Sequence, residues 1–307
     1  MLGLPRSVRI REVGPRDGFQ NEPEIIPTAD KVRLIELLGR TGLQRLEVTA
    51  FVRADVIPQL ADAREVLMQI DVPAAVERSV LIANDRGLDA ALEVREHFDA
   101  VSVFLSASQT HNAKNVNRTV GESLAGLERV LGRAAEAGLR RTAILATSFG
   151  CPYEGVVAED RVMELALALA DAGATEVGFG DTTGMANPAQ VTGFFTRAAE
   201  ELGDRVELTA HFHNTRGQGL ANALAALQAG CTSFESSFGE LGGCPVPAGA
   251  TGNIATEDLV SMLHEMGVGT GIELARLLEA ADAAARTLGR PLGSHTLVAG
   301  PVDWRRP

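Results

Sequence analysis

The stretch Glu159–Gly180, EDRVMELALALADAGATEVGFG, contains one complete helix-to-strand unit. Its apolar residues recur at helical spacing as far as Asp171, and Gly173 follows where a helix would end. The short apolar run that closes the stretch is typical of a buried parallel strand. We therefore expect a helix over residues 159–171 and a strand over residues 176–180.

The same unit recurs along the whole chain. Eight strand-like runs are expected: Val8–Val13, Arg45–Ala50, Ser79–Ala83, Ala100–Leu105, Arg141–Thr147, Glu176–Gly180, Val206–Phe212 and Ser233–Ser237. Helix-like stretches separate them, as over residues 28–40. Eight such units predict an α/β fold, a closed (β/α)8 TIM barrel with a C-terminal helical extension, and the alternative is an open doubly wound sheet.

We find no composition break, so one catalytic domain over residues 1–307 is expected, with the barrel over about 7–255. The C-terminal part, about 256–307, shows helical periodicity over residues 256–267 and 272–288. From Arg290 onward the tail is expected to be irregular.

The overall charge limits the partners. The chain has 40 acidic and 28 basic residues, a net charge of −12, which disfavours nucleic acid and anionic membranes as partners. No apolar run approaches the roughly 20 residues of a membrane span, and the N-terminus has no apolar signal core. Three cysteines without metal-ligand spacing favour a reducing compartment. We expect a cytoplasmic protein.

Two histidines, His211 and His213, lie one residue apart near the end of the seventh strand. Because side chains alternate along a strand, both face the same side, as they would to bind one metal ion. Two hydrogen-bonded structural histidines are the alternative. Strand one runs into Asp17, and only strand eight separates strands one and seven in a closed barrel. These three side chains are therefore expected to converge.

A divalent ion held by such nitrogen and oxygen ligands would act as a Lewis acid on a substrate oxygen. Asn253 would add a neutral oxygen. This donor set, without thiolate, suits Mg²⁺ or Mn²⁺ and remains compatible with Zn²⁺ or Co²⁺. Arg16 would place a cation beside an oxyanion formed there, with Glu47 holding Arg16 or a metal-bound water. A plain N-terminal salt bridge is the alternative for Arg16.

The stretch Gly239–Asn253 follows the eighth strand and is rich in glycine and proline. It is expected to be a mobile loop over the barrel mouth, and an ordinary surface connection is the alternative.

Several motifs together resemble the 3-hydroxy-3-methylglutaryl-CoA lyase family, over a match from about Arg9 to Leu278. They are Arg11–Glu22 (REVGPRDGFQNE), Gly150–Gly155 (GCPYEG), Gly180–Thr182 (GDT), His211–His213 (HFH), Leu241–Pro245 (LGGCP) and Gly252–Leu259 (GNIATEDL).

The resemblance implies a divalent metal bound by Asp17, His211, His213 and Asn253, and an acyl-CoA substrate. It also implies retro-Claisen cleavage of a 3-hydroxyacyl-CoA into acetyl-CoA and a ketone or ketoacid. Arg16 would stabilise the enolate and Glu47 would support Arg16, while Cys244 would protonate the departing carbon. Asp181 and His211 are both candidates for the base. A homodimer is the family expectation.

Other positions have weaker assignments. Gln20, Lys114 and Asn115 are candidate substrate contacts, and a charged surface loop is the alternative for the last two. Without the resemblance, Cys244 has the alternative of a small buried apolar residue. Cys151 and Cys231 are interpreted as packing residues.

Some positions depart from the family pattern. Ala50 and Gly178 replace serines, and Thr142–Ala146 (TAILA) replaces a segment with an arginine, a tyrosine and a serine. We therefore hypothesise that the acyl substrate carries a bulkier or less polar C3 group than 3-hydroxy-3-methylglutaryl-CoA. Compensation by other residues is the alternative.

Three other functions compete with a lyase. A Claisen condensing synthase of the isopropylmalate or homocitrate type shares the Arg-Asp-Gly-x-Gln and His-x-His motifs, but such synthases carry long C-terminal additions. An amidohydrolase is disfavoured because its His-x-His lies on the first strand. A non-catalytic acyl-CoA-binding barrel is disfavoured because the site residues are all present.

Overall fold

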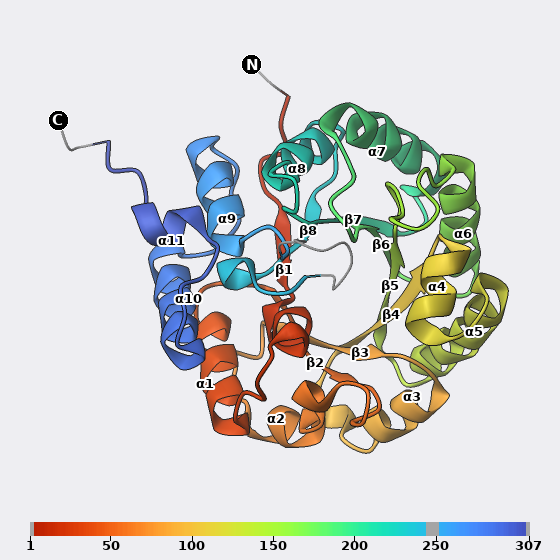
Figure 1. Ribbon diagram of the computed structural model, residues 1–307, viewed down its shortest axis with the longest axis horizontal. Helices are drawn as coiled ribbons and strands as arrows, with labels where there is room; N and C mark the ends of the chain where they lie inside the picture. Colours follow the sequence, from red (N-terminus) through yellow and green to blue (C-terminus); the bar gives the residue numbers. More distant parts are fainter. Residues whose placement is uncertain (1–2, 244–251, 305–307) are drawn as a thin grey trace.

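The computed structural model describes residues 3–243 and 252–304, and its eight parallel strands form a closed barrel (Figure 1). Each strand pairs with the next, and β1 pairs with β8. The strands are β1 Arg9–Glu12, β2 Arg45–Phe51, β3 Glu77–Ile82, β4 Ala100–Ser106, β5 Arg140–Ala146, β6 Glu176–Asp181, β7 Glu207–Phe212 and β8 Ser233–Ser236. The (β/α)8 prediction is confirmed.

Helices surround the barrel (Figure 1). They are α1 Thr28–Gly39, α2 Ala63–Gln69, α3 Asp85–Leu92, α4 Gln109–Val116, α5 Val120–Glu136, α6 Glu159–Asp171, α7 Pro188–Leu202, α8 Gly219–Gln228, α9 Thr256–Glu265, α10 Leu274–Leu288 and α11 His295–Ala299. Among the described residues, none of these helices is long and apolar enough to cross a membrane.

The C-terminal helices lie on the flank of the barrel between α8 and α1, with α9 against α8 and α10 against α1 (Figure 1). The irregular tail predicted from Arg290 is partly wrong, because the tail forms the short helix α11. Ser294 caps its start by accepting a hydrogen bond from the Leu297 backbone N–H. Asp258 of α9 accepts two more, from the N–H groups of His295 and Thr296. Sequence periodicity cannot detect a helix whose start depends on a distant carboxylate.

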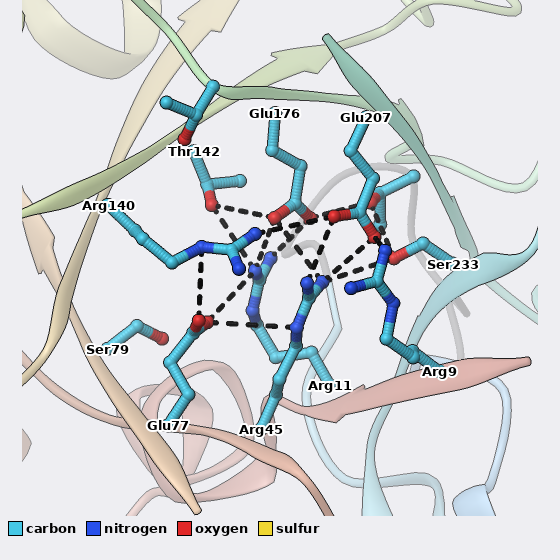
Figure 2. A network of polar contacts seen from close by, with 12 residues as sticks. Arg9, Arg11, Arg45, Glu77, Ser79, Arg140, Thr142, Glu176, Glu207 and Ser233 are labelled. Atoms are coloured by element: carbon cyan, nitrogen blue, oxygen red, sulfur yellow. Dashed lines mark hydrogen bonds and ion pairs between the residues drawn. The ribbon is translucent and has the colours of Figure 1, made fainter.

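The inside of the barrel is ionic at the amino ends of its strands (Figure 2). TIM barrels are usually filled there by layers of branched apolar side chains. Here Arg11, only 1% exposed, donates hydrogen bonds of 2.9 and 2.7 Å to the two carboxylate oxygens of Glu176. Arg45 contacts the same carboxylate and that of Glu207. Buried charges are costly unless paired, and pairing is what this layer provides. The carboxyl ends of the strands remain free for a site.

Candidate metal centre and active site

Asp17, His211 and His213 come together at the carboxyl end of the barrel, as expected. One candidate ligand atom of each lies within 4.8 Å of the other two, and the Nε2 atoms of the histidines are 3.1 Å apart. His211 lies on β7, and His213 directly follows the end of this strand. The turn Gly14–Gly18 after β1 carries Asp17. A single cation would reach all three groups.

Asn253 completes this group. Its backbone forms a β-bridge with His213, and its Nδ2 donates a 2.7 Å hydrogen bond to Asp17 Oδ2. Its Oδ1 is buried and accepts no hydrogen bond from the described residues. Buried polar atoms normally have a partner. A divalent ion beside Asp17 would provide one, so the donor set fits the predicted metal.

The charges in the cluster affect one another. Burial opposes ionisation of Asp17, but the charges of Arg16, His211 and His213 outweigh it and lower its pKa. Burial would also lower the pKa of His211, but the hydrogen bond and charge of Glu235 outweigh it and raise that pKa. Asp17 is therefore held as a carboxylate, which is the form that binds a cation.

Arg16 lies between two acidic side chains. Its Nε donates a 2.5 Å hydrogen bond to Glu47 Oε2, and its Nη1 donates one of 2.8 Å to Asp17 Oδ1. Glu47 of β2 is 1% exposed. These two salt bridges hold the Arg16 guanidinium beside Asp17, which is one of the candidate metal ligands.

Asp181, the last residue of β6, is also buried. Its Oδ1 accepts hydrogen bonds from the backbone N–H groups of Met185, at 2.7 Å, and Ala186, at 3.1 Å. Its Oδ2 is buried and has no hydrogen-bond partner among the described residues. Burial raises the pKa of Asp181 to about 6, although the two hydrogen bonds oppose the shift. One oxygen is therefore available to accept a proton.

Two acidic side chains to which the sequence assigned no role lie next to these residues. Glu235 of β8 places its Oε2 3.0 Å from His211 Nδ1. Glu12 of β1 accepts hydrogen bonds from the backbone N–H groups of Gly14 and Phe238, and so joins the turn that carries Asp17 to the segment after β8. The inward alternation of Ser233 and Glu235 on β8 was a signal that could have identified Glu235.

The glycine-rich segment is only partly described. Cys244 lies outside the described residues, as do all residues from 244 to 251. The two ends of the segment cross closely: a side chain at Gly252 would place its Cβ 2.0 Å from the carbonyl oxygen of Glu240 and 2.4 Å from that of Gly242. Only glycine fits this crossing, which holds Asn253 near Asp17.

The candidate substrate contacts lie farther out. Lys114 and Asn115 are exposed on α4, and Lys114 Nζ lies 4.9 Å from the ring centre of Tyr153. The α4 helix therefore meets the GCPYEG motif. Gln20 is partly exposed in the short turn Phe19–Asn21 that follows the turn carrying Asp17. Cys151 and Cys231 are buried, as predicted.

Two of the positions that depart from the family pattern, Ile144 and Gly178, face one another. Ile144 of β5 pairs in register with Gly178 of β6, and a Cβ built at Gly178 would lie 2.4 Å from Ile144 Cδ1. Thr142, two residues before Ile144, hydrogen-bonds to Arg11 inside the barrel, so Ile144 points inward too. The isoleucine occupies the space that a side chain at residue 178 would need.

Comparisons with known proteins agree with this geometry. The HMGL-like family model matches residues 7–283. A hydroxymethylglutaryl-CoA lyase of Bacillus subtilis, YngG, is 46% identical over 96% of this chain and 98% of its own. The mitochondrial hydroxymethylglutaryl-CoA lyase of Rattus norvegicus is 41% identical over 95% of this chain and 89% of its own.

Solved structures give the same result. The crystal structure of the Bacillus subtilis HMG-CoA lyase superposes with a TM-score of 0.91, at 46% identity, over 96% of this chain and 98% of its own. An HMG-CoA lyase of Acinetobacter baumannii in complex with coenzyme A and 3-methylmalate superposes with a TM-score of 0.92, at 38% identity, over 98% of each chain. The chain belongs to the HMGL-like family.

Proposed function

We propose that this protein is a divalent-metal-dependent carbon–carbon lyase that cleaves 3-hydroxy-3-methylglutaryl-CoA or a close C3 analogue to acetyl-CoA and a ketoacid. The observation that carries the proposal is the convergence of Asp17, His211 and His213 beside Arg16 in a chain of this family. The complex of one relative with coenzyme A and 3-methylmalate supports an acyl-CoA substrate for this chain.

Asp17, His211, His213 and Asn253 would hold the metal, as Mg²⁺ or Mn²⁺, with Zn²⁺ or Co²⁺ also compatible with the donor set. When bound, this ion supplies Lewis-acid polarisation of the substrate oxygens. Arg16, fixed by Glu47 and Asp17, places a permanent cation where negative charge develops on the thioester oxygen of the enolate.

Asp181 is the better candidate for the base. Its Oδ2 is without a partner among the described residues, whereas Nδ1 of His211 faces Glu235 and its Nε2 faces His213. A pKa of about 6 keeps the Asp181 carboxylate ionised at neutral pH yet more basic than an ordinary aspartate. Asp181 takes the proton of the C3 hydroxyl, and the C2–C3 bond breaks. Cys244 then returns a proton to C2 of the acetyl-CoA enolate.

The proposed substrate differs from 3-hydroxy-3-methylglutaryl-CoA at C3, where we infer a bulkier or less polar group. Three partly exposed apolar side chains lie on neighbouring strands: Leu81 on β3, Phe104 on β4 and Ile144 on β5. Phe104 pairs in register with Ile144. Ile144 points into the barrel, and Gly178 beside it has no side chain. The side chains of Leu81, Phe104 and Ile144 offer apolar surface and carry no hydrogen-bond donor.

We propose a cytoplasmic homodimer that has neither nucleic acid nor a membrane as partner, with Gln20, Lys114 and Asn115 as contacts of the acyl-CoA. Light scattering after gel filtration measures the molar mass in solution. The mass of a dimer is expected, and the mass of a monomer would contradict the proposal. The charge of Lys114 suits a phosphate of coenzyme A.

The function is tested by incubating the enzyme with Mg²⁺ or Mn²⁺ and either 3-hydroxy-3-methylglutaryl-CoA or analogues extended at C3. Acetyl-CoA and the matching ketoacid are expected, with the higher kcat/KM for an extended analogue. A high kcat/KM confined to the methylglutaryl compound would overturn the C3 proposal alone. Consumption of acetyl-CoA with release of free thiol would identify a Claisen synthase instead.

A further inference from the structure

The ionic layer inside the barrel reaches the metal ligands through Glu235. Its Oε1 accepts a 2.8 Å hydrogen bond from Arg11 Nη1, and its Oε2 lies 3.0 Å from Nδ1 of His211. Glu235 is 3% exposed and Arg11 is 1% exposed. Both oxygens of the buried Glu235 carboxylate therefore have a partner: one contacts the ionic layer at the amino ends of the strands, and the other contacts the candidate metal site.

The surrounding layer holds Arg11 in place. Figure 2 shows arginine and glutamate side chains from several strands converging around it. The ion pairs join Arg9, Arg11, Arg45 and Arg140 to Glu77, Glu176, Glu207 and Glu235. The four arginines match the four glutamates in number, and Arg11 is the guanidinium of this layer that pairs with Glu235.

The direction of the His211 ring matters for metal binding. A neutral imidazole carries its proton on one nitrogen and binds a metal through the other. A carboxylate beside Nδ1 accepts the proton on that atom and leaves the Nε2 lone pair for the metal. In this structure Nε2 faces His213, on the side where Asp17 lies.

We propose that Arg11 and Glu235 are positioning residues of the metal centre, with Arg11 holding Glu235 and Glu235 holding His211 so that its Nε2 faces Asp17 and His213. The inference rests on the metal site of the proposed function. The inference extends the metal site from the carboxyl ends of the strands to the ionic layer at their amino ends. The ionic layer would then support metal binding as well as fill the barrel.

Glu176 provides a matched control. It is also buried, with 0% exposure, and it also binds Arg11, through two hydrogen bonds. Within the described part of the chain, its side chain accepts hydrogen bonds from Arg11, Thr142 and Thr209 and from none of the proposed metal ligands. A substitution at Glu176 therefore disturbs the same ionic layer while leaving the direct contact between Glu235 and His211 intact.

The test is calorimetric titration of the full-length, metal-free enzyme with Mn²⁺, together with its thermal unfolding temperature. Glu235→Ala is expected to weaken Mn²⁺ binding about 10- to 100-fold. Glu235→Gln keeps one acceptor for two donors, so an intermediate affinity is expected, and this variant serves if the alanine variant does not fold. Glu176→Gln is expected to lower the unfolding temperature while its Mn²⁺ affinity changes much less than that of Glu235→Gln.

Equal losses of Mn²⁺ affinity in Glu235→Gln and Glu176→Gln would overturn the inference, because they would indicate a general effect on folding. Unchanged affinity in both Glu235 variants, or no Mn²⁺ binding by the wild-type enzyme, would also overturn it. If the wild-type enzyme binds Mn²⁺ and the Glu235 variants bind it more weakly, but no acyl-CoA is cleaved, the proposed function fails and the inference stands.

Discussion

Gly178→Ala tests how closely the inner wall of the barrel is packed. The new Cβ would lie 2.4 Å from Ile144 Cδ1 and 3.8 Å from Ile144 Cγ1. Two carbon atoms cannot remain at the shorter distance, so the end of the isoleucine must move. Thr209 Cβ, at 3.9 Å, is the other near neighbour and needs no adjustment.

The magnitude follows from this one contact. Adding a methyl group to a packed interior costs about 1–3 kcal/mol, because neighbouring side chains leave their preferred rotamers. In an Ile144→Ala background the clashing atom is absent, and the new methyl group partly fills the vacated space. We therefore expect Gly178→Ala to cost almost nothing there, which corresponds to a coupling of about 1 kcal/mol or more between the two positions.

Thermal unfolding of the wild type, both single variants and the double variant measures this coupling. For a chain of 307 residues, a change of 1 kcal/mol shifts the midpoint of thermal unfolding by about 1–2 °C. Equal downward shifts from Gly178→Ala in both backgrounds would refute the packing argument. The kcat/KM values of the same proteins for substrates of increasing C3 size then test whether Ile144 shapes the acyl pocket.

Asp181→Asn is expected to lower kcat by about 10²- to 10⁴-fold. In the wild type, activity should rise as the pH increases through about 6, because Asp181 ionises there. If the variant kept the pH–rate profile of the wild type, Asp181 would not be the base. Because burial raises this pKa above the roughly 4 of an unfolded aspartate, ionisation favours unfolding, and this carboxyl should destabilise the metal-free protein as pH rises from about 4 to about 6. Asp181→Asn should then be more stable than the wild type at pH 8, as thermal unfolding measures. Arg16→Gln is expected to lower kcat by about 10²- to 10³-fold, and an unchanged kcat would remove Arg16 from the chemistry. Cys244→Ala should nearly abolish turnover while calorimetry finds Mn²⁺ binding intact, and unchanged turnover would exclude the thiol.

The barrel could be predicted from the sequence because short strand-like runs alternate with stretches of helical periodicity and this unit repeats eight times. The observed strand ends differ from the predicted ones by at most two residues. The convergence of Asp17 with the histidines followed from chain order alone, since a closed barrel brings strands one, seven and eight together.

Contacts that depend on the register between neighbouring strands could not be predicted from the sequence in this way. Arg11, Glu176 and Glu235 lie on β1, β6 and β8, and only the tilt and register of the closed barrel bring them together. The same holds for Ile144 and Gly178, which appear in the sequence as two separate departures from a family pattern. The structure makes them one packed pair.

The central claim is tested most directly by mass spectrometry of the products formed from 3-hydroxy-3-methylglutaryl-CoA and its C3-extended analogues, with Mn²⁺ and after its removal by a chelator. We expect equal amounts of acetyl-CoA and the matching ketoacid, formed only when the metal is present. Failure to form acetyl-CoA from any of these thioesters, or cleavage at an undiminished rate without metal, would contradict it.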